Sequence, residues 1–457
     1  MCQLKKYLSI VLMAMFVALL SSCSGNDYLN VIPSNSIALI SLDVRQMGEE
    51  SKLDDKAGML KSMLHVDDVA DCGIDIMQKI YLFESADGNL GMCAKVADSD
   101  DMQAWLKGLA KQGICQPLTE RKDCHFTVLK DSWLVGFSDE ALLVMGPVVA
   151  EAQAELQRQM TKYLNADEEA GIKGTPMFGR LDSIPTSMAM VAQVKALPEK
   201  FVAPFTFGAP KGSDASQIMI AAEMEQSDGL FHISGETFSF NKNVDAALKQ
   251  AAKVYRPIKG TYVKSMPADA LAGIFMNVNG KDFLPMLQSN KGLQALLMGI
   301  NTAIDMDNII RSVDGDMSIV LSSMSDNEIK MMMGAQLGHS GWLADVDYWK
   351  QSCPKGSAIG NWGKNAFCYS DGKTSFYFGV TDDRQFFSGT EESMAENVIK
   401  PSVHPVPVSV QKAVEGQKMA MVLNLSQTGG SSEVVATVTS LLTPIFGNIN
   451  SIVYTLK

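Results

Sequence analysis

The clearest chemical signal in this sequence is Cys23, which follows two serines at the end of an apolar stretch. Lys5 and Lys6 precede that stretch, and residues 7–20 are apolar but too few to span a bilayer. A cysteine directly after such a segment is typical of a lipobox, in which the thiol is acylated, for example with palmitate. The pattern predicts a lipoprotein signal peptide over residues 1–22 and lipidation of Cys23. The alternative is an ordinary signal peptide followed by an incidental cysteine.

Gly338-His339-Ser340-Gly341 resembles a nucleophile elbow, in which Gly-x-Ser-x-Gly projects a serine from a sharp turn between a strand and a helix. Trp342 occupies the position of the last glycine, and no histidine and acid with informative spacing accompany the serine. A turn in which Ser340 caps the following helix is therefore favoured.

Asp371-Gly372-Lys373-Thr374 resembles the end of a phosphate-binding loop. That loop needs a glycine where this chain has Phe367, and it must open a helix, whereas this segment lies between two predicted strands. A hairpin turn is favoured.

His65, Asp68 and Cys72 are spaced to share one face of a helix, with Asp67, Asp71 and Asp75 nearby. Metal sites need at least three converging ligands with supporting contacts. A solvated acidic helix end is the favoured interpretation. No metal, cofactor or catalytic residue is predicted anywhere in the chain.

The composition predicts a folded acidic protein. Of its 457 residues, 46% are hydrophobic and 20% charged, and the formal net charge is −12. The sequence has no cluster of basic residues interleaved with aromatic ones, so nucleic acid is excluded as an expected partner. After Leu20 no apolar run approaches the roughly 18 residues of a membrane helix. The membrane contact is therefore expected to be the lipid on Cys23.

Four apolar runs have the same form, and each ends on Asp, Gln or Asn followed by Val or Leu. Near-continuous apolar runs of this length predict strands buried on both faces and covered by helices. The runs are 37–44, 188–194, 271–278 and 419–425.

The order of elements after these runs predicts an internal duplication. A helix, a hairpin and a tryptophan-bearing helix follow the first and third runs. Gly136-Phe137-Ser138-Asp139-Glu140 with Gly146 then matches Gly379-Val380-Thr381-Asp382-Asp383 with Gly389. We expect an α+β fold of two similar halves, each a largely antiparallel or mixed sheet with helices packed against it. The expected segments are a tether at 23–30, a first half at 31–257, a second half at 265–457, and a flexible Pro-rich stretch at 400–408.

Six cysteines remain besides Cys2 and Cys23, an even number that is compatible with disulfides in an oxidising compartment. Two of them end the tryptophan-bearing helices, and two more lie in the strands that follow. This placement favours bridges Cys115–Cys124 and Cys353–Cys368, with Cys72–Cys93 remaining. The alternative is six free buried thiols.

The lipobox, the opening Asn30-Val31-Ile32-Pro33-Ser34-Asn35-Ser36, the strand ending in Asp43-Val44 and Cys72-Gly73-Ile74-Asp75 together resemble a family of cell-envelope lipoproteins called domain of unknown function 4836. The resemblance covers nearly the whole chain after the signal peptide. It implies an envelope lipoprotein of Gram-negative anaerobes and carries over no active residue.

The expected function is a non-enzymatic binding or structural module of the cell envelope, anchored by its lipid in the outer membrane and contacting a protein or an envelope polymer. An enzyme is the less favoured class. One alternative is an envelope hydrolase with a site between the halves, and another is an inhibitor or immunity-type partner. Ser24-Gly25-Asn26-Asp27 leaves both faces of the membrane open.

Overall fold

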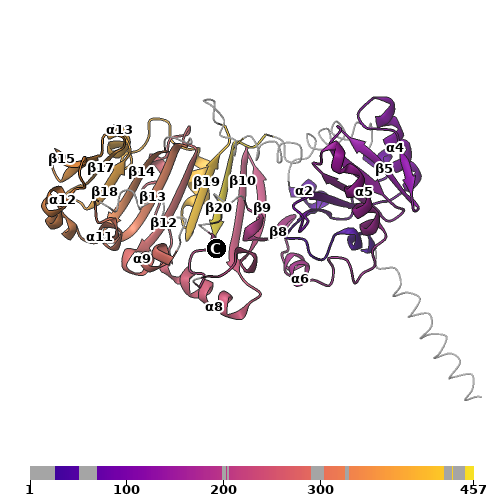
Figure 1. Cartoon of the computed structure of the whole chain (residues 1–457), viewed down its shortest axis with the longest axis horizontal. Helices are drawn as coiled ribbons and strands as arrows, with labels where there is room; N and C mark the ends of the chain where they lie inside the picture. The colour runs from indigo at the N-terminus through magenta and orange to yellow at the C-terminus, as the bar shows by residue number, and fades with distance from the viewer. Residues whose placement is uncertain are drawn as a thin grey trace, which may run out of the picture. The chain divides into compact units, whose positions relative to one another are not determined.

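The computed structural model describes residues 26–50, 69–197, 202, 205–210, 212–289, 303–324, 329–426, 435 and 448–457. The chain divides into two compact units, Met1–Ser183 and Ile184–Lys457 (Figure 1). Four residues that the sequence analysis singled out lie outside the described residues, namely Cys23, His65, Asp67 and Asp68.

The first unit contains an antiparallel sheet with the strand order β1-β2-β3-β7-β6-β5-β4. Buried and partly buried positions alternate along most of β2 and β3, as expected when the two faces of a sheet differ in burial. The strands are β1 (Ala38–Leu42), β2 (Ile80–Glu84), β3 (Leu90–Lys95), β4 (Thr119–Arg121), β5 (Cys124–Leu129), β6 (Trp133–Phe137) and β7 (Ala141–Gly146).

Helix α4 (Ser99–Lys111) begins at Asp98, whose carboxylate accepts the N–H groups of Asp100 and Asp101. Its buried residues Met102, Leu106 and Leu109 recur every three to four positions, which gives one apolar stripe against the sheet. Helix α5 (Ala150–Leu164) packs on β6 and β7. Shorter helices are η1 (Asp27–Val31), α2 (Val44–Glu50), η2 (Val69–Cys72) and α6 (Pro176–Asp182).

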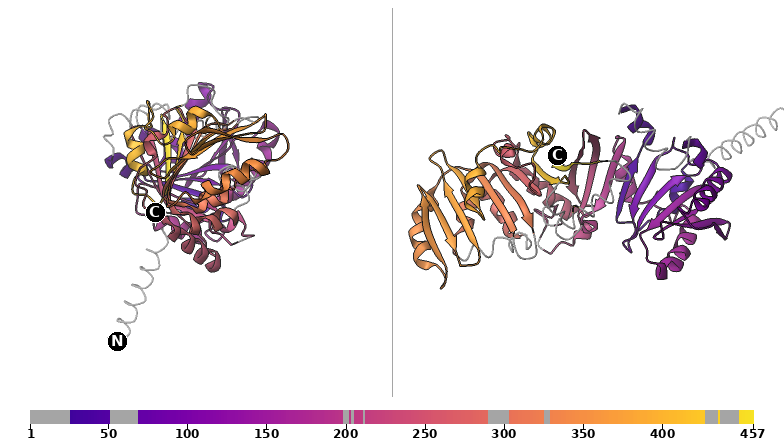
Figure 2. Two further views of the ribbon diagram at one scale, coloured as in Figure 1. Left: turned by 90° about the vertical axis from the view of Figure 1, so that its left-hand side faces the viewer. Right: turned by 90° about the horizontal axis from the view of Figure 1, so that it is seen from above.

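The sheet of the second unit is continuous, and its strands lie side by side in Figure 2. The order is β8-β9-β10-β20-β19-β12-β13-β14-β18-β17-β16-β15, with β10 and β20 parallel and the other neighbours antiparallel. Strand β11 (Tyr255–Arg256) pairs with the end of β12. The others are β8 (Met188–Gln193), β9 (Met219–Ser227), β10 (Leu230–Phe238), β12 (Ala272–Asn279), β13 (Val313–Met324), β14 (Ile329–Leu337), β15 (Ala358–Gly363), β16 (Ala366–Ser370), β17 (Ser375–Val380), β18 (Gln385–Gly389), β19 (Met419–Asn424) and β20 (Ser451–Leu456).

Both faces of this sheet carry an apolar core. Phe275 and Met276 are consecutive on β12 but belong to different clusters, because successive side chains of a strand point to opposite faces. The helices of the second unit are η3 (Val194–Ala196), η4 (Ala215–Gln217), α8 (Lys242–Ala251), η5 (Ala252–Val254), η6 (Val263–Ser265), α9 (Gly280–Ser289), α11 (Met306–Arg311), η7 (Gly341–Asp345), α12 (Val346–Ser352), α13 (Glu392–Asn397) and α14 (Val408–Val414).

The structure confirms a mixed α+β fold with largely antiparallel sheets. The four predicted apolar strands are confirmed as β1, β8, β12 and β19. The strand order of the first unit also recurs as β12-β13-β14-β18-β17-β16-β15 in the second.

The division into compact units differs from the predicted halves at 31–257 and 265–457. Residues 184–257 belong to the second unit, because Val194, Ile220 and Leu248 share one buried cluster with Met276 and Tyr454. Apolar contacts across the parallel β10–β20 pair thus join a segment from the middle of the chain to the strand at Ser451–Leu456.

The stretch 400–408, expected to be flexible, is bonded to the segment before β12. The N–H of Ser402 donates to Lys264 O, that of Ala268 to His404 O, and that of Val406 to Met266 O. Val406 is 2% exposed. Buried backbone groups need such partners, and here the two segments supply them to each other.

Candidate functional site

The second unit carries a shallow pocket of about 350 Å³ on its surface. It is lined by β15, β16, β18, α13 and the residues after that helix. The lining residues are Trp362, Gly363, Ala366, Phe387, Glu392, Glu396, Ile399 and Lys400.

Trp362 lies between two other aromatic rings. Its ring centroid is 5.3 Å from that of Tyr377 and 6.1 Å from that of Phe387, at interplanar angles of 69° and 68°. These are edge-to-face contacts. Phe387 lies over Gly379, because a Cβ at that glycine would stand 2.5 Å from the phenyl ring. The rings therefore form a corner rather than a flat platform.

Strand alternation places these aromatic side chains on the face opposite the main cluster, where Phe387 packs against the second one. On β16 and β17, Tyr369, Phe376 and Phe378 are buried in the main cluster with Trp342. The intervening positions face the other side of the sheet, where Tyr377 is partly exposed. A bulge between Asn361 and Gly363 lies at Trp362, and bulges change the direction of a side chain near a strand end.

The acidic wall of the pocket is helix α13. Glu392 and Glu396 are one helical turn apart, which places them on one face of the helix, and both are exposed. The ammonium group of Lys400 is 4.0 Å from a carboxylate oxygen of Glu396. Two carboxylates and one ammonium give the lining an excess of negative charge, in a chain of net charge −12.

The lining of the pocket differs in two respects from common hydrolase sites. The lining residues include no serine, histidine or cysteine that could act as a nucleophile or its base. Glycosidases place two carboxyl groups on either side of the bond to be cut. Glu392 and Glu396 instead project from one short helix on one wall.

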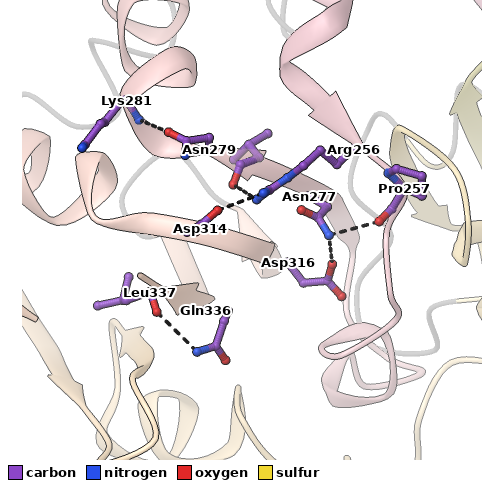
Figure 3. A network of polar contacts seen from close by, with 10 residues as sticks. Arg256, Pro257, Asn277, Asn279, Lys281, Asp314, Asp316, Gln336 and Leu337 are labelled. Carbon is purple, nitrogen blue, oxygen red and sulfur yellow. Dashed lines mark hydrogen bonds and ion pairs between the residues drawn. The ribbon is translucent and has the colours of Figure 1, made fainter. Parts of the chain in front are cut away.

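A second polar cluster lies at the ends of β12 and β13 (Figure 3). Asp316 is 3% exposed, and its carboxylate accepts hydrogen bonds from Lys259 N at 3.0 Å, Thr261 N at 2.9 Å and Asn277 Nδ2 at 2.9 Å. Asn277 Nδ2 also donates to Pro257 O at 3.0 Å. The cluster fixes residues 257–261, the expected joint between the halves, to the sheet, so its role is structural.

Arg256 and Asp314 extend this cluster toward solvent. Arg256 Nη1 donates to Asp314 Oδ1 at 2.9 Å, and Nη2 donates to Val278 O at 2.7 Å (Figure 3). Nearly half of each side chain is exposed, so this ion pair contributes little to stability. Asp305 caps α11 through Asn308 N, so Asp305, Asp314 and Asp316 have three separate roles.

The prediction that the Ser340 side chain caps the following helix is wrong. Ser340 does precede η7, but its side chain makes no capping hydrogen bond. His339 Nδ1 accepts the N–H of Gly341 at 3.3 Å instead. The imidazole of His339 therefore takes the acceptor role that was predicted for the Ser340 hydroxyl.

The hairpin turn at Asp371 is confirmed. Asp371 Oδ1 accepts the N–H groups of Lys373 and Thr374 between β16 and β17. These backbone hydrogen bonds lower the pKa of the Asp371 carboxyl, since they stabilise its charged form.

The predicted disulfides are absent, and all six described cysteines are free thiols. Cys115 is paired with Leu129 at the far end of β5 from Cys124, five residues away. Five residues of strand span roughly 17 Å, whereas a disulfide needs Cα atoms within about 7 Å.

The other two pairings fail for reasons of sheet geometry. Cys353 and Phe367 both pack against the main core. Cys368 follows Phe367 on β16 and therefore points to the opposite face of the sheet. Cys72 lies in the cluster under α4, whereas the thiol of Cys93 donates to Tyr28 O at 3.3 Å, outside that cluster.

The remaining residues of the predicted acidic group do not converge. Asp71 is exposed, Cys72 is buried, and Asp75 lies 3.6 Å from Lys95 Nζ. In the part of the chain that the structure describes, no three side chains of His, Cys, Asp or Glu form a group that could hold a metal ion. No described helix is both long and apolar enough to cross a membrane.

Sequence reasoning missed the pocket. The signal that could have found it is the alternation of aromatic residues on β17 and β18, since Tyr377 and Phe387 fall on the face opposite the main cluster and are only partly buried.

The fold and the pocket define a mixed α+β protein of two compact units with a shallow aromatic and acidic site on the second. The chain matches the family described as Domain of unknown function (DUF4836) over residues 28–406 and belongs to that family. This confirms the family expected from the sequence. A comparison with curated proteins gives no match. Among solved structures, the chain is similar to that titled "Structure of crystal form IV of TP0453", with 9% identity and a TM-score of 0.28, over 44% of this chain and 76% of that chain.

Proposed function

We propose that this protein is a non-enzymatic binding module of the cell envelope, held by a lipid on Cys23 in the outer membrane, with the aromatic and acidic pocket as its ligand site. The observation that carries the proposal is the corner formed by Trp362, Tyr377 and Phe387 beside Glu392 and Glu396. Partly exposed aromatic rings next to fixed charges are typical of recognition sites. The partner is a protein or an envelope polymer.

We further propose that each of the two units contains one copy of an internal duplication. The common strand order of their sheets supports this proposal. With Gly136 aligned to Gly379 and Gly146 to Gly389, Val144 takes the place of Phe387 and Gln153 that of Glu396. The pocket residues therefore belong to one copy, as expected for a site acquired after duplication on a retained scaffold.

The described residues supply no observation that favours the alternatives, a hydrolase or an inhibitor. A hydrolase would need an activated nucleophile or carboxyl groups facing each other across the substrate. An inhibitor would be expected to present a contiguous apolar patch.

The test is binding by the mature chain, purified from membranes in detergent, to two probes: an array of neutral oligosaccharides and a phage-displayed library of random decapeptides. Substituting Trp362→Ala or Glu392→Gln is expected to weaken retention of whichever probe binds. Glu151→Gln, at an exposed position near the start of α5, is the matched control. Failure of both probes to bind in a pocket-dependent manner would refute the proposal.

A further inference from the structure

We propose that the edge strand β15 pairs with an extended peptide segment of a partner protein, and that the adjoining pocket holds a lysine or arginine side chain of that peptide. This inference rests on the binding function proposed above and specifies the class of its ligand.

The first observation is the state of the β15 edge. β15 pairs with β16 from Ala358–Ser370 to Gly363–Ala366, and the described residues place no strand on its other side. Four of its six residues are exposed. Proteins usually protect such edges with lysine, proline or a bulge, because unpaired N–H and C=O groups can accept another strand. β15 has a bulge near its end but neither lysine nor proline.

The second observation is that two glycines of β15 are not required by the fold. A Cβ at Gly360 would meet no atom within 4 Å, and one at Gly363 would make ordinary contact with Ala366 Cβ at 3.5 Å. Neither glycine has a positive φ. Glycine weakens a strand interior and often marks a place where another backbone approaches closely. These two positions leave the edge accessible to a peptide main chain.

The third observation joins the edge to the pocket. Trp362 and Gly363 are the last residues of β15 and also line the pocket, so a peptide paired with this strand would direct alternate side chains toward it. Lysine and arginine have apolar stems that pack on aromatic rings and cationic heads attracted to ring faces. Glu392 and Glu396 would lie near that head, with Lys400 offsetting only part of their charge.

The same features disfavour two other occupants. A neutral saccharide could stack on the rings but would leave the β15 edge and the acidic wall unused. A second copy of this chain would bring together two molecules of net charge −12, and β15 itself offers no basic side chain. A basic extended peptide uses the edge, the rings and the carboxylates together.

The experiment selects random displayed decapeptides on the mature chain and measures the selected peptides as synthetic, fluorescently labelled ligands. Selected peptides are expected to share a lysine or arginine at one position. The double substitution Glu392→Gln with Glu396→Gln is expected to weaken their binding at least tenfold. Glu151→Gln with Glu155→Gln, an exposed pair at the same spacing on α5, is the matched control and should leave binding unchanged. Methylating alternate backbone nitrogens of the peptide should also weaken binding at least tenfold, since methylation removes the strand donors.

Selection of no peptides, of peptides without a basic position, or of peptides insensitive to backbone methylation would each overturn the inference. If neutral oligosaccharides alone bind in a manner that depends on Trp362, the peptide inference fails while the binding function stands. If neither probe binds, both fail. Dimerisation of the chain that competes with peptide would identify a second copy as the occupant and also overturn the inference.

Discussion

Asn277 and Asp316 lie directly opposite each other on β12 and β13, and the side-chain amide of Asn277 donates to the Asp316 carboxylate at 2.9 Å. The same carboxylate accepts the N–H groups of Lys259 and Thr261. One buried acid therefore accepts hydrogen bonds from two backbone N–H groups of the connection, which are shielded from water and would otherwise have no acceptor.

Replacing Asp316 with alanine is expected to lower the free energy of unfolding by about 3 kcal/mol or more, because three donors lose their acceptor in a buried place. Urea unfolding followed by circular dichroism measures the change. Asp314→Ala, two residues earlier on the same strand, removes only an exposed ion pair and should cost less than about 1 kcal/mol. Equal losses for the two variants would contradict the structural role assigned to Asp316.

Two tryptophans of the second unit should differ sharply when truncated. Trp342 is 0% exposed and stacks on Trp349 with ring centroids 6.0 Å apart, so Trp342→Ala should destabilise the protein by about 3–5 kcal/mol. Trp362 is partly exposed at the pocket, and Trp362→Ala should cost only about 1 kcal/mol. Thermal and urea unfolding of both variants provide the comparison. A loss at Trp362 as large as that at Trp342 would indicate a core role instead of a binding role.

The thiols should stay reduced in the folded protein. Thiol counts on the denatured mature chain are expected to be the same before and after reduction. In the native state Cys353 and Cys368 should react first with a disulfide reagent, since Cys72 and Cys93 are 0% exposed. Burial also raises the pKa of the Cys93 thiol, which disfavours the reactive thiolate. Cys368→Ser should remove one fast-reacting group, and a rise in the count on reduction would show that a bridge forms.

His232 should make stability depend on pH below neutrality. Burial lowers the pKa of its imidazole from 6.5, with Glu225 opposing and Lys457 reinforcing the shift, and Nε2 lies 2.9 Å from Thr455 Oγ1. The unfolded chain takes up a proton near pH 6.5 while the folded chain does not, so stability falls as pH drops through this range and levels off below the folded pKa.

Urea unfolding of the wild type and of His232→Gln, measured between pH 7.5 and 5, tests this dependence. The variant should show a flatter pH profile than the wild type. His404→Gln is the control, because the His404 side chain is exposed and lies outside the β10–β20 pair. Identical profiles for the wild type and His232→Gln would contradict the prediction.

Lipidation at Cys23 is tested by metabolic labelling with an alkyne analogue of palmitate in the native type of cell. Cys23→Ser should lose the label and leave the membrane fraction, because the lipid on Cys23 is the expected membrane anchor. Cys2→Ser, within the predicted signal peptide, should keep both. Retention of label by the Cys23→Ser chain would place the lipid on another residue and contradict the prediction.

The sequence alone determined the elements whose signal is local. Apolar runs of seven or eight residues predicted β1, β8, β12 and β19, since such runs are too short for most helices and too apolar for exposed loops. The turn at Asp371 followed in the same way from a short side chain next to glycine. The family was also predicted correctly from short sequence motifs and their order along the chain.

Only the tertiary structure decided which distant residues meet. Cys353 and Cys368 are close in sequence, yet strand alternation puts them on opposite faces of a sheet. Residues 184–257 join the second unit because β10 pairs with β20, a contact that spans more than 200 residues. The pocket at Trp362 likewise needs β15, β18 and α13 together. Local patterns record the environment of each residue, whereas a site depends on long-range pairing that one-dimensional periodicity does not encode.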